Sequence, residues 1–131
     1  MDLESRMANV EAQRPSGGTS AENILTAALA AAEPAPGLSW LDVGCGTGRM
    51  FRAILDQHRP SRLVGIDIID WLDPDLTDAV DMYVGPAEET IRLAPHVDRV
   101  LLIEALEHLE APWVVLRTAA RLVVPGGRLV L

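Results

Sequence analysis

Apolar residues recur along the chain with two different periods, and the change from one period to the other marks out the elements. Helical spacing predicts helices over about 20–32, from 49 to about 58, from 86 to about 93, and from about 111 to 122. Short apolar runs between turn residues predict strands that end near 43 and strands at 63–67, 81–84, 97–103 and 128–131. The acidic stretch 69–76 is too short for a full helix, so we expect one or two turns there, broken at Pro74.

Strands that alternate with helices predict a doubly wound, mostly parallel sheet with helices on both faces, an α/β three-layer sandwich. The nearly continuous apolar run at 97–103 is typical of a central strand buried on both faces. Residues 1–18 are polar and aperiodic, and we interpret them as a mobile N-terminal tail that could carry a short helix around 3–10. Residues 19–131 then form the folded domain.

Composition narrows the class of protein. At 131 residues and 49% hydrophobic, the chain has the size and apolar content of one globular domain. A net charge of −8 argues against a broad phosphate-binding surface, so nucleic acid is not an expected partner. The single cysteine excludes an internal disulfide and fits a reducing compartment. With no signal-peptide pattern and no apolar run near the roughly 18 residues of a membrane span, we expect a cytoplasmic protein without membrane contact.

The stretch 39–49 carries the strongest chemical signal. An apolar run ends in Asp42, three glycines then alternate with small residues at Gly44, Gly46 and Gly48, and a helical pattern follows. This predicts a strand, a tight loop and a helix N-terminus. A ligand can lie against bare glycine backbone, with amide groups and the positive end of the helix dipole facing it. A nucleotide-type ligand is therefore the first hypothesis.

The spacing of the glycines separates the nucleotide families. A dinucleotide fingerprint would put its third glycine where Arg49 stands, whereas here it comes one residue earlier, and the lysine of a P-loop is absent. The second apolar strand ends in Asp67, about 20 residues after the loop, where an acid can accept hydrogen bonds from both ribose hydroxyls.

Four pieces of the chain together resemble the class I S-adenosylmethionine-dependent methyltransferases: residues 41–48, 64–67, 104–109 and 122–129. The resemblance implies a Rossmann-like sheet of order 3-2-1-4-5, S-adenosylmethionine as cofactor and S-adenosylhomocysteine as product. Members of that family normally continue with a helix and two more strands, which this sequence lacks. We therefore expect a second copy or another partner to cover the exposed edge of the fifth strand. The helix at 20–32 either lids the cofactor, as in related enzymes, or covers one edge of the sheet.

The resemblance also assigns roles to residues. Asp42 would hold the methionine end of the cofactor, partly through the loop, and Asp67 the ribose. The remaining cofactor contacts would come from Gly44, Cys45, Gly46, Ile68, Ala87, Glu88 and Glu104. No neighbouring base could ionise the Cys45 thiol, so we expect its side chain to pack inward rather than to act as a nucleophile. No metal site is predicted.

The resemblance breaks at the position after Gly85. Related enzymes usually carry an acid there that binds the adenine amino group, but this chain has Pro86, which has neither a carboxylate nor an N–H group. Either Glu88 or the backbone amide of Ala87 would then have to serve the adenine. The expected consequence is looser cofactor binding.

Glu104, Glu107 and His108 follow the fourth strand, close to where the methyl group would lie. Glu104 and His108 are four residues apart and could pair on a helical turn. His108 could take the proton of an acceptor hydroxyl near neutral pH, or it could serve only in packing. The methyl group of a sulfonium is already activated, so the protein mainly aligns the reactants and excludes water.

Three functions remain open at this stage. The first is methyl transfer to a small molecule, with oxygen or carbon favoured over nitrogen because an Asn-Pro-Pro-Tyr type motif is absent after the fourth strand. The second is a methyltransferase-like binding or regulatory module without catalysis by this chain alone. The third, a nicotinamide-dependent oxidoreductase, is disfavoured by the glycine spacing.

Overall fold

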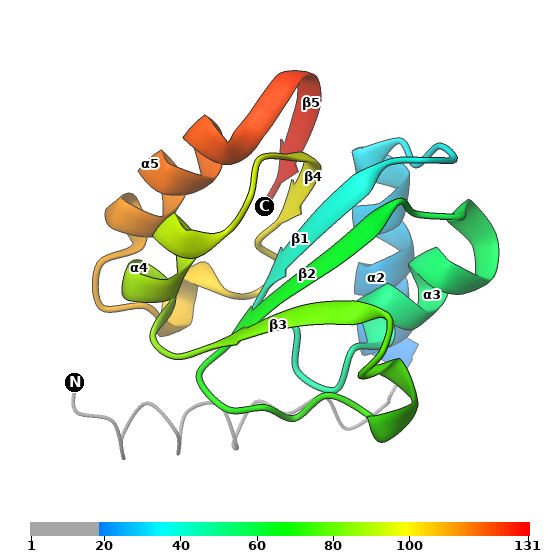
Figure 1. Cartoon of the computed structure of the whole chain (residues 1–131), viewed down its shortest axis with the longest axis horizontal. Helices are drawn as coiled ribbons and strands as arrows, with labels where there is room; N and C mark the ends of the chain where they lie inside the picture. Colours follow the sequence, from blue (N-terminus) through cyan, green and yellow to red (C-terminus); the bar gives the residue numbers. More distant parts are fainter. Residues whose placement is uncertain (1–18) are drawn as a thin grey trace.

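Five parallel strands form the middle layer of the computed structural model, which describes residues 19–131 (Figure 1). They are β1 (Ser39–Val43), β2 (Arg62–Asp67), β3 (Val80–Val84), β4 (Val97–Leu101) and β5 (Val123–Val130). The order across the sheet is β3-β2-β1-β4-β5, and every neighbouring pair is parallel. The predicted fold class and strand order are therefore confirmed. The predicted mobile tail at 1–18, with its short helix, lies outside the described residues.

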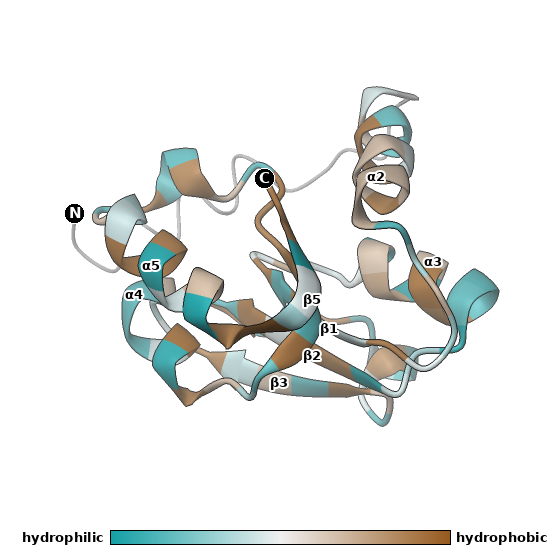
Figure 2. Ribbon diagram, turned by 90° about the horizontal axis from the view of Figure 1, so that it is seen from above, coloured by the Kyte–Doolittle hydropathy of each residue, from teal (hydrophilic) through white to brown (hydrophobic). Residues whose placement is uncertain are grey.

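Two pairs of helices cover the two faces of the sheet (Figure 2). Helices α2 (Thr19–Ala32) and α3 (Arg49–His58) lie on one face, and α4 (Ala87–Thr90) and α5 (Pro112–Leu122) lie on the other. Because successive side chains of a strand point to opposite faces, Trp40 packs into the core beneath α2 and α3, while Leu41 packs into the core beneath α4 and α5. Burial on both faces explains why the central strands read as continuous apolar runs.

Several element bounds differ from the sequence prediction. The helix predicted over 86–93 is split into α4 and a 3-10 turn at Ile91–Leu93, and β4 ends at Leu101 rather than at 103. The acidic stretch 69–76 forms one 3-10 turn, Pro74–Leu76, which agrees with the expected length, but the turn begins at Pro74 instead of being broken there.

The fifth strand is longer than predicted because its turn residues lie inside it. β5 begins at Val123, which pairs with Val97, and its next paired residue, Arg128, lies opposite Arg99. Residues 124–127 thus form a bulge against a single residue of β4. The Pro-Gly-Gly sequence at 125–127 therefore bends a strand instead of leading into one.

Arg99 fastens α2 to the sheet. It is 9% exposed, and its guanidinium donates hydrogen bonds to the backbone carbonyls of Ala32, Glu33 and Asp98. Two of these carbonyls lie at the C-terminal end of α2, where a positive charge also stabilises the helix dipole. An ion pair of 2.8 Å between Arg128 and Glu33 holds the same end to β5.

Replacing Arg99 by methionine should destabilise the domain markedly. The substitution removes hydrogen bonds from a buried charged donor and leaves the helix-end carbonyls without it, so we expect a loss of about 2–4 kcal/mol in the free energy of unfolding. The matched control is Arg62→Met, because Arg62 forms only an exposed ion pair with Asp81 and should contribute less than about 1 kcal/mol. Urea unfolding of both variants measures the difference, and equal losses would contradict this role of Arg99.

Candidate functional site

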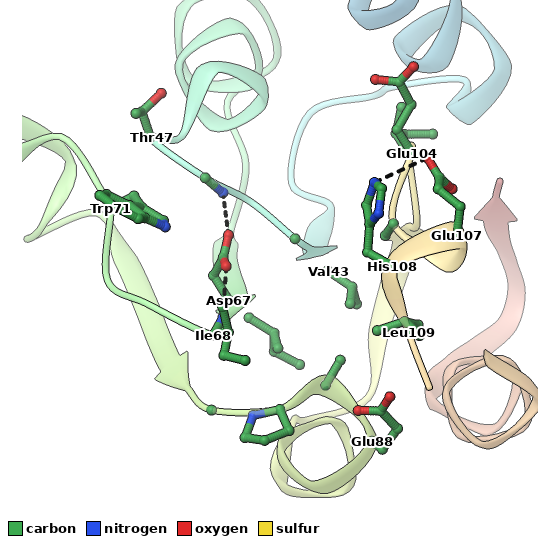
Figure 3. Close-up of a pocket in the computed structure, with 18 residues that line it drawn as sticks. Val43, Thr47, Asp67, Ile68, Trp71, Glu88, Glu104, Glu107, His108 and Leu109 are labelled. Atoms are coloured by element: carbon green, nitrogen blue, oxygen red, sulfur yellow. Dashed lines mark hydrogen bonds and ion pairs between the residues drawn. The ribbon is translucent and has the colours of Figure 1, made fainter. Parts of the chain in front are cut away.

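A hollow of about 540 Å³ opens at the carboxyl ends of the strands, where the loops after β1, β2, β3 and β4 meet (Figure 3). All predicted site residues except Asp42 and Cys45 line it: Gly44, Gly46, Asp67, Ile68, Ala87, Glu88, Glu104 and His108. Residues from four separate segments of the chain are thus brought to one place, because parallel strands all end at the same edge of a sheet.

The glycine loop and the end of β2 are joined by hydrogen bonds. The backbone N–H of Gly46 donates to Oδ2 of Asp67 over 2.8 Å, and the N–H of Ile68 donates to Oδ1 over 2.7 Å (Figure 3). Gly46 has a φ of 56°, and a Cβ atom at this position would meet no heavy atom within 4 Å. A side chain would be strained there and would project into open space, whereas glycine leaves bare backbone beside the carboxylate.

Asp42 and Cys45 lie behind the wall of the hollow. Cys45 is buried and its Sγ lies 3.6 Å from Sδ of Met82, so its side chain packs inward as expected. Burial, and to a smaller extent the charges of Asp42 and Asp67, raises the pKa of the Cys45 thiol far above its ordinary value. A thiol that stays protonated is not a nucleophile. Gly65 makes this packing possible, because a Cβ atom there would lie 2.9 Å from both sulfur atoms.

Two buried carboxyl groups, Asp42 and Asp67, lie on the same face of the sheet. Asp42 pairs with Gly65 in the β1–β2 register, so Asp67 follows two residues further along β2, pointing the same way. Burial, with a further contribution from the charge of Asp67, raises the pKa of Asp42 from 3.8 to about 8. Burial also raises the pKa of Asp67, against the opposing effect of the backbone N–H groups that it accepts.

The side of the hollow opposite the glycine loop is formed by the start of α4. Pro86, Ala87 and Glu88 all line it. Oε1 of Glu88 accepts the backbone N–H of Glu110 over 3.1 Å, so this carboxylate also ties α4 to the segment before α5. The hydrogen bond restrains the side chain that sequence reasoning offered as a substitute for the missing acid.

The predicted pairing of Glu104 with His108 is wrong. His108 Nε2 lies 3.5 Å from Oε1 of Glu107 instead, and the Glu104 side chain points toward α2 (Figure 3). The reason is local: Glu104 has a left-handed backbone with a φ of 54°, and the 3-10 turn begins only at Leu106. No continuous helical turn therefore joins positions 104 and 108.

Trp71 also lines the hollow, although sequence reasoning did not single it out. Its segment is held by the glycine loop and by α3: the N–H of Asp73 donates to the carbonyl of Thr47, and Arg52 of α3 binds Asp75 with two hydrogen bonds of 2.9 Å. The sequence feature that could have identified Trp71 is its place in the short loop directly after the second strand, at the edge of the sheet where ligands bind.

Residues 41–131 match the model of a family described as methyltransferase domain. The chain belongs to this family. A mitochondrial ubiquinone biosynthesis O-methyltransferase of Arabidopsis thaliana is 26% identical over an alignment 110 residues long, which covers 76% of this chain and 33% of that protein. The chain therefore spans about a third of that relative's length.

Solved structures show the same fold for the methyltransferase domain. A Burkholderia thailandensis 1,6-didemethyltoxoflavin-N1-methyltransferase with bound S-adenosylhomocysteine is similar over 97% of this chain and 58% of its own, with a TM-score of 0.73 and 20% identity. The cyclase SpnF is similar over 88% of this chain and 46% of its own, with a TM-score of 0.74 and 21% identity. The likeness at these identities is one of fold, and the fold carries more than one reaction.

The hollow of this methyltransferase domain is acidic. Among its described lining residues, four carry carboxylates, Asp67, Glu88, Glu104 and Glu107, and none is a lysine or arginine. Such a lining attracts a ligand with positive charge. In the part of the chain that the structure describes, no helix is long and apolar enough to cross a membrane, and no group of three or more potential ligands is placed to hold a metal ion.

The stability of the methyltransferase domain should fall as pH rises, because of Asp42. Burial raises the pKa of Asp42 from 3.8 to about 8, so between these two pH values the folded domain keeps a proton that the unfolded chain has released. The free energy of unfolding therefore falls as the pH rises through this range. Asp42→Asn cannot ionise, and between pH 5 and 7.5 the wild type should lose about 3 kcal/mol more stability than this variant. Urea unfolding at both pH values measures this, and parallel pH profiles would contradict an Asp42 that is protonated in the folded state.

Proposed function

We propose that this methyltransferase domain binds S-adenosylmethionine in the hollow at the carboxyl ends of its strands and methylates a small molecule on oxygen or carbon. The observation that carries the proposal is the 2.8 Å hydrogen bond between the Gly46 backbone and the Asp67 carboxylate, which puts bare main chain and a ribose acceptor on one wall. Membership of the methyltransferase family supports it.

The residues present fit the cofactor. Asp67 would accept the ribose hydroxyls, and the backbone of Gly44, Cys45 and Gly46 would hold the methionine end, with Asp42 behind the loop. A hollow of about 540 Å³ falls within the range of small-molecule sites, and its acidic lining suits the positive charges of the sulfonium and the ammonium group.

The adenine would lie between Ile68 and the start of α4. Ile68, Ala87 and Glu88 all line that part of the hollow. Pro86 supplies no carboxylate and no N–H group, and Glu88 is already engaged with the backbone of Glu110. We therefore expect this domain to hold the adenosyl group more weakly than a relative with an acid after the glycine.

S-adenosylmethionine supplies a methyl group that its positive sulfur has already activated. What the chain adds is alignment of the acceptor, exclusion of water and a place for the acceptor's proton. His108 lines the hollow next to Glu107, and its imidazole could serve as the base that takes this proton. The carboxylate of Glu107 would stabilise the resulting imidazolium.

An oxygen acceptor has the stronger support of the two. The plant relative is named an O-methyltransferase. His108 is a base that can assist the loss of a proton from a hydroxyl, whereas an ordinary C–H group is a weaker acid and would need a stronger base.

A second candidate function is a methyltransferase-like binding module without catalysis by this chain. The observation that favours it is Pro86 at the adenine position of the hollow.

Titration with S-adenosylhomocysteine tests the cofactor site. Trp71 lines the hollow, so binding should change the tryptophan fluorescence, and Trp71→Phe should remove that change. Asp67→Ala should weaken binding about 100-fold, because it removes the carboxylate that would accept hydrogen bonds from both ribose hydroxyls. The matched control is the exposed acid Asp78, whose change to alanine alters the net charge equally but should leave affinity unchanged.

The outcomes of this titration separate the candidate functions. Binding of S-adenosylhomocysteine with the predicted loss in Asp67→Ala supports the methyltransferase. No response to it or to nicotinamide dinucleotides would favour a binding module without cofactor. Binding of a nicotinamide dinucleotide alone would instead favour an oxidoreductase.

The role of His108 is tested by the pH dependence of methyl transfer to a hydroxyl acceptor. His108→Gln should lower kcat by about 10²–10⁴-fold near pH 7 while the affinity for S-adenosylhomocysteine stays the same. The rate of the variant should approach that of the wild type at high pH, where the acceptor hydroxyl ionises by itself. An unchanged kcat at pH 7 would leave His108 with a packing role only.

A further inference from the structure

The connection between β2 and β3 contains very little helix. Parallel neighbours are usually joined through an α-helix, but residues 68–79 form only the 3-10 turn Pro74–Leu76. The backbone hydrogen bonds inside this connection join residues only two or three positions apart. Contacts with other elements must therefore fix its course, and the same contacts decide where Trp71 lies in the lining of the main hollow.

Arg52 of α3 makes three hydrogen bonds to this connection. Its guanidinium donates two of 2.9 Å to the two carboxylate oxygens of Asp75 and one of 3.3 Å to Oδ2 of Asp73. The bidentate pair with Asp75 fixes the direction of approach as well as the distance. The hydrogen bonds from Arg52 also hold the pKa of the Asp75 carboxyl below its ordinary value, so this acid stays charged at neutral pH. We call Arg52, Asp73 and Asp75 the clasp.

The connection has no basic residue of its own. Residues 68–79 contain four aspartates and no lysine, arginine or histidine. Asp73 and Asp75 are close in sequence and would repel each other without the cation that they share. The side chains of the clasp are all partly exposed, so the clasp should add little to the stability of the whole domain. Its main effect is on the local position of the connection.

The apolar side of the connection packs against the same end of α3. A Cβ atom at Gly48, the N-cap of α3, would lie 2.6 Å from Cδ1 of Leu76 and 2.9 Å from Cδ1 of Leu72. Arg52 follows one helical turn later, and its N–H donates to the carbonyl of Gly48. The residues directly after Trp71 are therefore held from two sides, by close packing and by the clasp.

Trp71 borders one particular part of the hollow. In Figure 3 it lies on the opposite side of Asp67 from His108, near Thr47. The indole is thus placed beside the carboxylate that would bind the ribose, and away from the place where a methyl group would be transferred. An indole ring offers a large, rigid apolar surface, so a small displacement of it changes the shape of this wall.

We propose that Arg52 is a positioning residue of the cofactor site, which holds the connection 68–79 through the clasp so that the Trp71 indole forms the wall beside Asp67. The inference rests on the proposed function, because the ligand that this wall would serve is the adenosyl group. Arg52 itself does not line the hollow, so its effect on binding has to pass through the connection.

Calorimetric titration with S-adenosylhomocysteine compares the wild type with Arg52→Gln, Arg52→Lys and the control Arg62→Gln. Arg62 also forms a partly exposed ion pair, with Asp81, but it begins β2 at the edge of the sheet opposite the hollow. We expect Arg52→Gln to weaken binding about three- to tenfold, and Arg52→Lys to weaken it less, because lysine keeps the charge but not the bidentate geometry. Arg62→Gln should bind as the wild type does.

Asp75→Asn tests the clasp from its other partner. It should weaken S-adenosylhomocysteine in the same direction as Arg52→Gln, and the two changes combined should weaken it no more than Arg52→Gln alone. Urea unfolding should show similar midpoints for Arg52→Gln and Arg62→Gln, because each loses a partly exposed ion pair. A difference in affinity between these two variants is then local in origin.

A double-mutant cycle with Trp71→Ala shows whether Arg52 acts through this side chain. Arg52→Gln should weaken S-adenosylhomocysteine in the wild-type background and have little further effect once Trp71 is alanine. The same loss in both backgrounds would mean that Arg52 acts on the hollow by another route, and it would overturn the proposal.

Fluorescence quenching by acrylamide tests the position of Trp71 without any cofactor. The change Trp113→Phe first removes the exposed tryptophan, and Trp40 is fully buried, so the emission that acrylamide quenches in this background comes from Trp71. Adding Arg52→Gln should increase the quenching, whereas adding Arg62→Gln should not. Equal quenching in the three proteins would overturn the role of the clasp.

Two further results of the titration have distinct meanings. Equal affinities of Arg52→Gln and the wild type, or equal losses in Arg52→Gln and Arg62→Gln, would overturn the proposal that Arg52 positions the site. A wild type that does not bind S-adenosylhomocysteine would refute the proposed function instead. The clasp would then be judged by acrylamide quenching, which needs no ligand in the hollow.

Discussion

The hydrogen bond from the Gly46 amide to the Asp67 carboxylate is the interaction on which the site depends. It joins a loop that follows β1 to the end of β2, and it can form because these strands are parallel neighbours that end at the same edge. Glycine at 46 keeps side-chain atoms out of the space in front, and glycine at 65 leaves room for Cys45 to pack inward beneath the loop.

The site around this contact contains buried carboxyl groups that lower the stability of the fold. Asp42 and Asp67 are buried on one face of the sheet, and burial raises the pKa of both. Such groups are costly for a domain that has to fold and are useful to one that has to attract a positively charged ligand. A cation near these carboxylates would offset part of the desolvation free energy. Ligand binding and protonation are therefore two ways of reducing the same unfavourable burial of charge.

Helix α2 illustrates how one element can serve both the fold and the site. Its apolar face packs on the core around Trp40, and its C-terminal end is fixed by Arg99. Its exposed alanines line a second hollow, a groove of about 420 Å³ between α2 and the end of β5, and this groove shares the lining residues Ile103 and Glu104 with the main hollow. The sequence left open whether this helix lids the cofactor or covers a sheet edge. The structure places it on the face of the sheet, beside the β5 edge, with its alanines next to the second hollow.

The sequence by itself determined the elements, the glycine loop and Asp67, because helical and strand periods, turn residues and the positions of acids after strands depend on neighbours along the chain. The strand order came from resemblance to a family. Only the tertiary structure decided that His108 pairs with Glu107, that Pro-Gly-Gly bends β5 instead of preceding it, and that Trp71 reaches the hollow. These outcomes depend on contacts between distant segments, such as the tie from Arg52 to Asp75 and the register of β5 on β4. The groove beside Glu104 belongs with them, because a helix, a strand end and a left-handed turn form it only after the sheet has assembled.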